Sequence, residues 1–161
     1  MKKILSIGIL LLLASAQAFA SEPPKHHVII DTDGSPDDLR ALNMILSSGN
    51  TEVLAITSAD GTLEPEEGFM KIQALLNSLG HEGIVTSQGI ITKNEPSPLR
   101  GLAKQVSWGE EPLSYSEPPE IKELLVKVIE QEEKPVDIIS LGPLTNIANA
   151  VLMKSSIKKQ I

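Results

Sequence analysis

Two hydrophobic periodicities alternate along the chain and predict strands and helices in succession. Short runs rich in β-branched residues indicate buried strands at residues 28–30, 52–57, 84–86 and 136–141. Apolar positions at helical spacing indicate helices at residues 39–46, 65–79, 121–131 and 144–153. Strands that alternate with helices are typical of βαβ units, so the pattern predicts an α/β fold with a mainly parallel sheet and flanking helices.

Two segments do not follow this alternation. Residues 87–119 hold five of the eleven prolines and show little periodicity. A loop of this length in a compact domain usually has a function or covers a site. Residues 21–27 are polar and contain two prolines. We interpret them, including His26 and His27, as a solvated tail before the first strand.

The N-terminal segment predicts export. Residues 1–20 (MKKILSIGILLLLASAQAFA) combine a basic start, an apolar run and an A-x-A cleavage site before Ser21, which is the pattern of a secretory signal peptide. The apolar run is shorter than the roughly 20 residues that a membrane span needs. We therefore expect a protein of the bacterial periplasm or a secreted one, with no membrane attachment after cleavage. Residues 21–161 would form its α/β domain.

The composition excludes several classes of protein. A hydrophobic fraction of 41% is too high for a disordered chain. The absence of cysteine excludes a disulfide scaffold, a thiolate zinc site and a cysteine nucleophile. A formal charge of −7 and an aromatic content of 2% argue against a surface that binds nucleic acid.

Four of the six aspartates lie within eight residues, directly after the first predicted strand: Asp31, Asp33, Asp37 and Asp38. Ligands of parallel α/β sheets bind at the carboxyl ends of the strands, which is where this cluster falls. Asp37 and Asp38 can also stabilise the N-terminus of the next helix. Four carboxylates this close repel one another, and a hard cation such as calcium would relieve that repulsion. The cluster is therefore either a metal site or a set of solvated helix caps.

Three segments resemble the inosine-uridine preferring nucleoside hydrolases. VIIDTDGSPDDLRAL (28–42) resembles the family's N-terminal signature, an Asp-x-Asp-Pro-Gly-x-Asp-Asp pattern after a strand. VDIISLGPLTNIANA (136–150) resembles a later strand followed by a Gly-Pro-Leu-Thr-Asn-Ile-Ala turn and helix. AITSADGTL (55–63) matches a substrate-facing loop. The segments occur in family order, and the resemblance implies a Rossmann-like nucleoside hydrolase fold.

The resemblance also implies a metal site and a reaction. Asp33 matches the aspartate that binds Ca²⁺ and orients or deprotonates the attacking water. Asp38 matches a second calcium ligand, and the backbone carbonyl of Leu141 matches a third. The implied reaction is the calcium-dependent hydrolysis of the N-glycosidic bond of a ribonucleoside, which gives the free base and ribose.

Further roles concern the substrate and the support of the site. Asp37 matches the aspartate that holds the ribose hydroxyls. Thr62 stands where many members have an asparagine that helps to bind substrate, which leaves the substrate preference open. Asp31 is the first aspartate of the motif, and we expect it to orient the metal ligands without binding the metal itself. The family's Pro-Gly pair is replaced by Gly34-Ser35, with Pro36 one place later.

The family members are longer than this chain, and nothing here matches the His-Asp pair and other binding groups of their C-terminal half. We expect an N-terminal fragment, a truncated product or one part of a split gene. It would expose sheet edges and apolar helix faces. We expect little or no hydrolase activity from it alone. Its partners would be a ribonucleoside and either a missing C-terminal half or further copies in a homo-oligomer.

Two alternatives remain open at this point. Residues 31–35 (DTDGS) also resemble the first motif of haloacid-dehalogenase-like phosphatases, in which Asp31 would be the nucleophile and Asp33 the acid/base, with magnesium bound. Alternatively, the chain is a degenerate module that binds ribosides or calcium without turnover.

Overall fold

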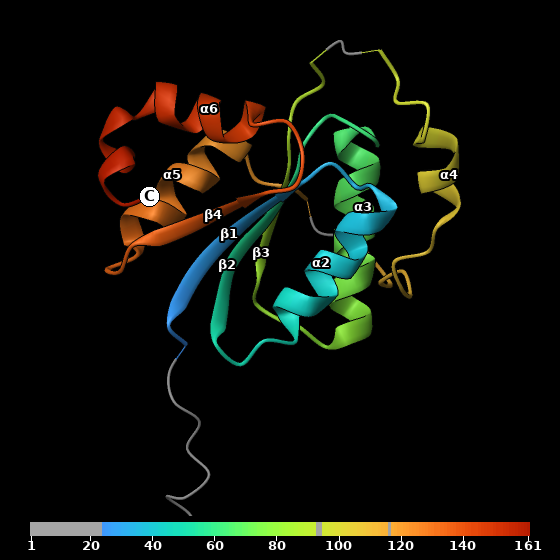
Figure 1. Cartoon of the computed structure of the whole chain (residues 1–161), viewed down its shortest axis with the longest axis horizontal. Helices are drawn as coiled ribbons and strands as arrows, with labels where there is room; N and C mark the ends of the chain where they lie inside the picture. The colour runs from blue at the N-terminus through green and yellow to red at the C-terminus, as the bar shows by residue number, and fades with distance from the viewer. Residues whose placement is uncertain (1–23, 93–94, 116) are drawn as a thin grey trace, which may run out of the picture.

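The computed structural model describes residues 24–92, 95–115 and 117–161, which form a parallel sheet between two layers of helices (Figure 1). The predicted signal peptide, residues 1–20, lies outside the described residues. Within the described ranges, every helix is too short or too polar to cross a membrane.

The strands of the described residues form one sheet in the order β3-β2-β1-β4, and each paired strand is parallel to its neighbour. Their bounds are β1 His26–Thr32, β2 Thr51–Ser58, β3 Val85–Gln88 and β4 Val136–Ser140. The chain moves outward from β1 to β3 and then returns to the other side of β1 at β4. Such a reversal opens a crevice at the carboxyl ends of β1 and β4, where ligands of this class of fold bind.

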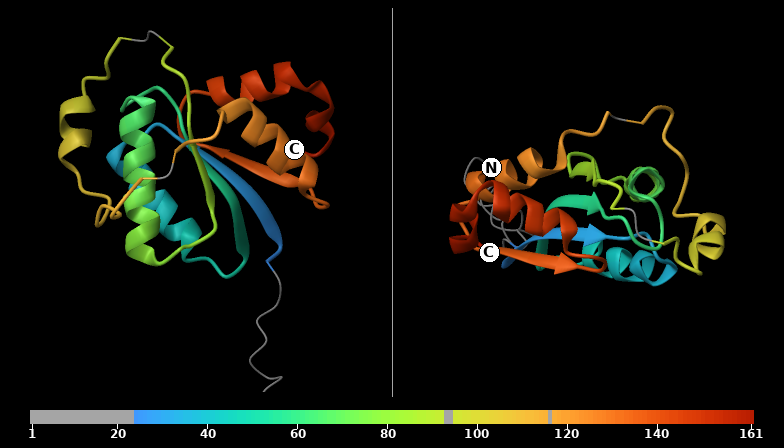
Figure 2. Two further views of the ribbon diagram at one scale, coloured as in Figure 1. Left: turned by 180° about the vertical axis from the view of Figure 1, so that it is seen from behind. Right: turned by 90° about the horizontal axis from the view of Figure 1, so that it is seen from above.

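The helices complete the two outer layers. Their bounds are α2 Pro36–Leu46, α3 Pro65–Leu79, α4 Arg100–Gln105, α5 Ile121–Gln131 and α6 Thr145–Met153, followed by a 3₁₀ helix, Ser155–Lys159. Helices α2 and α3 cover one face of the sheet, and α5 and α6 cover the other (Figures 1 and 2). Because side chains alternate along a strand, Val28 and Ile30 of β1 pack on the α2–α3 side, whereas Ile29 packs against α5.

Strand β4 lies at the edge of the sheet. The N–H of Val136 at its start donates to the carbonyl of Gln160 at 2.7 Å, and in the described part of the chain no strand pairs with its outer side. On the adjoining helix α6, Leu152 is 81% exposed and Met153 is 55% exposed. The expected open sheet edge and uncovered apolar helix face are both present.

The predicted strands and longer helices are confirmed, and their bounds differ at a few places. The first strand begins at His26, where its pairing with Thr51 of β2 begins, so His26 and His27 are not a tail before the strand. His26 is solvated as expected, whereas the expectation that His27 is solvated is wrong. His27 is 6% exposed, and its Nδ1 lies 3.1 Å from Glu132 Oε2. Helix α2 begins at Pro36, three residues before the apolar stripe, and α4 interrupts the segment predicted to be irregular.

Candidate active site

Asp31 anchors the site from inside the sheet. It lies in β1 opposite Thr57 of β2 and Ser140 of β4, and it is fully buried. Its Oδ1 accepts hydrogen bonds from the Thr57 hydroxyl at 2.6 Å and from Asn146 Nδ2 at 2.9 Å, whereas its buried Oδ2 has no hydrogen-bond partner among the described residues. Burial raises the pKa of Asp31 to about 6, although the Thr57 and Asn146 bonds oppose this rise. A carboxylate enclosed in this way cannot attack a phosphate, which argues against a phosphatase nucleophile.

Asp33 lies in a narrow slot just beyond the end of β1. Its Oδ2 accepts hydrogen bonds from the Thr62 N–H at 3.2 Å and the Thr62 hydroxyl at 3.3 Å, and its Oδ1 accepts one from the Ser35 N–H at 3.2 Å. Glycines form two walls of the slot. A Cβ atom on Gly61 would lie 2.5 Å from Asp33 Oδ2, and one on Gly142 would lie 2.7 Å from Asp33 Cβ. The slot therefore fixes Asp33 and admits no side chain at either wall.

Asp37 and Asp38 lie in the first turn of α2 but differ in environment. Asp38 is buried, and its two oxygens accept hydrogen bonds from the Thr32 hydroxyl at 2.6 Å and the Ser35 hydroxyl at 2.8 Å. Burial raises the pKa of Asp38, and repulsion from Asp33 and Asp37 adds to the rise. Asp37 is exposed, and the same Ser35 hydroxyl, whose one proton it shares with Asp38, lowers its pKa. Asp37 thus lies at the rim as an ionised acceptor.

The backbone at Leu141, directly after β4, lies beside Asp31 and Asp33. Its N–H donates to the carbonyl of Asp31 at 2.8 Å, which continues the pairing of β1 and β4 by one residue. The next residue, Gly142, forms a wall of the Asp33 slot. The structure therefore gathers most of the predicted site residues at one end of the sheet, with Asp37 at the rim: Asp31, Asp33, Asp38, Thr62 and Leu141.

Asp33, Asp38 and the backbone of Leu141 place hard oxygen donors at this end of the sheet. Across residues 24–92, 95–115 and 117–161, no group of three or more His, Cys, Asp or Glu side chains is arranged to hold a metal ion. Asp33 and Asp38 would supply carboxylate oxygens, and Leu141 would supply its carbonyl. Oxygen donors of this kind suit a hard cation, which would also relieve the repulsion that, after burial, adds to the rise in the pKa of Asp38.

Sequence reasoning assigned no role to three residues that support this site. Thr57 and Asn146 hold Asp31, and Arg100 contacts the loop that carries Thr62. Asn146 belongs to the Gly-Pro-Leu-Thr-Asn-Ile-Ala segment, so a signal for it was present. Arg100 lies in the proline-rich segment, where neither spacing nor motif marks it.

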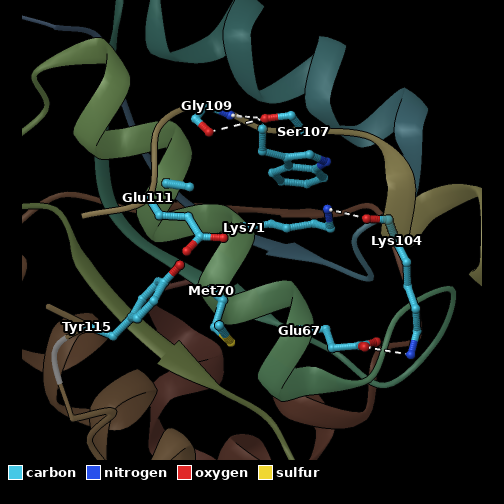
Figure 3. Close-up of a pocket in the computed structure, with 10 residues that line it drawn as sticks. Glu67, Met70, Lys71, Lys104, Ser107, Gly109, Glu111 and Tyr115 are labelled. Atoms are coloured by element: carbon cyan, nitrogen blue, oxygen red, sulfur yellow. Dashed lines mark hydrogen bonds and ion pairs between the residues drawn. The ribbon is translucent and has the colours of Figure 1, made fainter. Parts of the chain in front are cut away.

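A separate cavity of about 230 Å³ lies between α3 and residues 104–115, and none of the predicted site residues lines it (Figure 3). Lys71 of α3 points across it and donates to the carbonyl of Val106 at 2.6 Å and to that of Lys104 at 3.3 Å. Burial lowers the pKa of Lys71. Trp108 is 3% exposed and packs into the core beside α3. These contacts fix the segment that follows α4 against α3.

Known proteins with related sequences and structures are nucleoside hydrolases. The pyrimidine-specific ribonucleoside hydrolase RihA of Salmonella agona (strain SL483) is 32% identical, over 75% of this chain and 41% of RihA. The plant nucleoside hydrolase PpNRh1 superposes with a TM-score of 0.73 at 26% identity, covering 85% of this chain and 46% of that enzyme. An inosine-guanosine nucleoside hydrolase gives a TM-score of 0.74 at 22% identity, which shows the shared fold alone.

The match extends through all the elements that build the site. The family model for inosine-uridine preferring nucleoside hydrolases matches residues 28–161, from β1 to the last residue. The chain spans less than half the length of the relatives described above. The predicted Rossmann-like fold is confirmed, and the phosphatase interpretation is set aside. The chain belongs to the inosine-uridine preferring nucleoside hydrolase family.

Proposed function

We propose that this chain contributes the calcium-binding and water-activating part of a ribonucleoside N-glycosidase. The observation that carries the proposal is the placement of Asp33. Its carboxylate is held by Thr62 and Ser35 at the carboxyl end of β1, between the glycine walls and near buried Asp38. The proposed cofactor is Ca²⁺, held by Asp33, Asp38 and the carbonyl of Leu141. Export to the periplasm or beyond remains a proposal that rests on residues 1–20.

The side chains of the site would divide the chemistry among them. Asp33 orients a water molecule against C1′ of the ribose and accepts its proton. Asp37, ionised at the rim, accepts hydrogen bonds from the ribose hydroxyls, and Thr62 holds Asp33 and faces the substrate. The carboxylates also stabilise the positive charge that develops on the sugar as the bond from C1′ to the base nitrogen breaks. A bound calcium ion would acidify the water and hold the sugar hydroxyls.

We further propose that the 161-residue chain hydrolyses nucleosides poorly by itself. Calcium takes six to eight oxygen ligands, and this site would supply only three protein groups. The remaining ligands would come from substrate, water or polypeptide beyond these residues. The described residues would then bind calcium more weakly than a complete shell does.

The first experiment measures calcium binding and turnover on the purified chain. Isothermal titration with Ca²⁺ should show binding that Asp33→Asn weakens by roughly tenfold or more, because an amide cannot supply an anionic ligand. Release of ribose from uridine and from inosine, followed by a reducing-sugar assay, should be slight. Robust turnover would contradict the proposed impairment, and a chain that does not bind calcium would contradict the metal site. Calcium and ribose binding without any base release would favour the degenerate binding module.

Substitution of Gly61, which lies against the Asp33 carboxylate, provides a second test of the same site. Gly61→Ala places a Cβ atom 2.5 Å from Asp33 Oδ2, so the carboxylate must turn away from its position. Mutation of groups that orient a metal ligand typically costs 10- to 100-fold in metal affinity, and we expect a loss of about tenfold for calcium. The matched control is Gly49→Ala, because a Cβ atom there meets no atom within 4 Å. Equal calcium affinity in the two variants would show that Asp33 is not a ligand.

A further inference from the structure

The side chain of Arg100 contacts the loop between β2 and α3, residues 59–64. Arg100 is the first residue of α4, and its side chain is only 14% exposed. Its Nε donates to the carbonyl of Thr62 at 3.1 Å, and one terminal nitrogen donates to the carbonyl of Gly61 at 3.2 Å. The other terminal nitrogen pairs with Glu64 at 3.1 Å. The same nitrogen that contacts Gly61 also lies 3.8 Å from Asp60 Oδ1, so the planar guanidinium contacts four residues of one short loop: Asp60, Gly61, Thr62 and Glu64.

The loop that Arg100 grips is the one that holds Asp33. The carbonyl of Thr62 accepts from Arg100, while the N–H and the hydroxyl of the same residue donate to Asp33 Oδ2. The next N–H, that of Leu63, donates to the carbonyl of Asp33 at 2.9 Å. A continuous chain of hydrogen bonds thus leads from the guanidinium through the Thr62 backbone to the Asp33 carboxylate.

The support for Arg100 is itself fixed. Lys104, on the same short helix, pairs with Glu67 of α3 at 2.6 Å, and its carbonyl accepts a hydrogen bond from Lys71 (Figure 3). Four residues further along, Trp108 is buried against the core. Because these contacts hold α4 against α3, the backbone of Arg100 has a fixed position relative to the loop.

We propose that Arg100 is a positioning residue that keeps Thr62, and through it Asp33, in place. The inference rests on the proposed role of Asp33 in the site. In this proposal Arg100 acts through the loop, because its contacts are with residues 60–64. Lysine is a partial substitute at best, since a single ammonium cannot span the two carbonyls and Glu64 in the same plane.

The test follows the exchange of single amide hydrogens by NMR in the calcium-free 161-residue chain. In Arg100→Gln, the amide of Thr62 should exchange roughly tenfold faster or more, because the local opening of the loop becomes easier. Arg100→Lys should lie between this variant and the wild type. Lys154→Gln is the control, since it removes a half-exposed cation that pairs with Glu130 and does not contact the loop or α4. Amides of β1, such as that of Ile30, should be unchanged in all variants.

An unchanged Thr62 amide in Arg100→Gln would overturn the proposal. So would a rise that spreads equally to β1, because that would indicate general destabilisation. Calcium titration then separates this inference from the proposed function. Where the wild-type chain binds calcium, we expect Arg100→Gln to bind roughly tenfold more weakly, and equal binding would overturn the positioning role. A wild-type chain that does not bind calcium would contradict the proposed metal site, and the exchange of the Thr62 amide would still decide the role of Arg100.

Discussion

Asp31→Asn should raise the free energy of unfolding of the calcium-free chain by about 2–3 kcal/mol at about pH 8 and by less than about 1 kcal/mol at about pH 4. The pKa of Asp31 is about 6 in the folded chain against 3.8 for the ordinary group, because burial disfavours its charge. The stability that the protonated carboxyl contributes is complete below the unfolded value. It is lost as the pH rises through about 6, and the neutral asparagine avoids that loss.

The measurement is urea unfolding of wild type and Asp31→Asn across this pH range, with a chelator present so that no cation compensates the charge. Glu82→Gln is the control, since Glu82 is an exposed carboxylate in the loop after α3, and it should change stability by less than about 0.5 kcal/mol. A difference between wild type and Asp31→Asn that stays constant with pH would contradict the assigned ionisation. The expected gain also means that the natural carboxylate is kept at a cost in stability, as is common at functional sites.

The second large effect concerns Asn146, which we expect to be essential for a stable site. Asn146→Ala should lower the free energy of unfolding by about 3 kcal/mol, since it leaves a buried carboxylate short of a donor and opens a small void. Asn146 is 1% exposed, and its Nδ2 donates both to Asp31 Oδ1 and to the carbonyl of Ser58 at 3.0 Å. Gly89 packs so closely that a Cβ atom there would lie 2.5 Å from Asn146 Oδ1.

Asn43→Ala serves as the matched control in thermal and urea unfolding. Asn43 is half-buried, and its Nδ2 donates to the carbonyl of Leu39 within one helix, so its loss should cost less than about 1 kcal/mol. Asn146→Asp gives an independent check, because a second carboxylate beside Asp31 should destabilise the chain more at about pH 8 than at about pH 5. Similar unfolding free energies for the Asn146→Ala and Asn43→Ala variants would contradict the role of Asn146.

Most of the fold follows from local patterns that are strong in this sequence. Helix α3 spans residues 65–79 as predicted; it begins at Pro65 and is followed by Gly80 in the left-handed conformation at φ 68°. Helix α4 could not be predicted, because six residues form too few turns to show a periodicity and its contacts are tertiary. The burial of His27 escaped detection for a similar reason, since it depends on Glu132 and Lys134, which are distant in sequence.

The candidate site was predicted in part because its carboxylates are close together in sequence. Asp31, Asp33 and Asp38 stand in one motif, and the parallel sheet brings Leu141 beside them. Asp38 is buried and Asp37 is exposed because α2 begins at Pro36 and turns the two side chains in different directions. The sequence alone does not show where this helix begins. Arg100 reaches Thr62 across 38 positions, and no local pattern records such a contact.

The burial of Trp108 against α3 has a practical consequence. It is the single tryptophan of the chain, so the intrinsic fluorescence of the protein excited on indole comes from one known position. That position lies eight residues after Arg100, in the segment that α3 holds in place. The emission wavelength of this indole therefore reports the position of the segment that supports the Asp33 loop. Emission should shift to longer wavelength when this segment leaves the core and Trp108 becomes exposed to water.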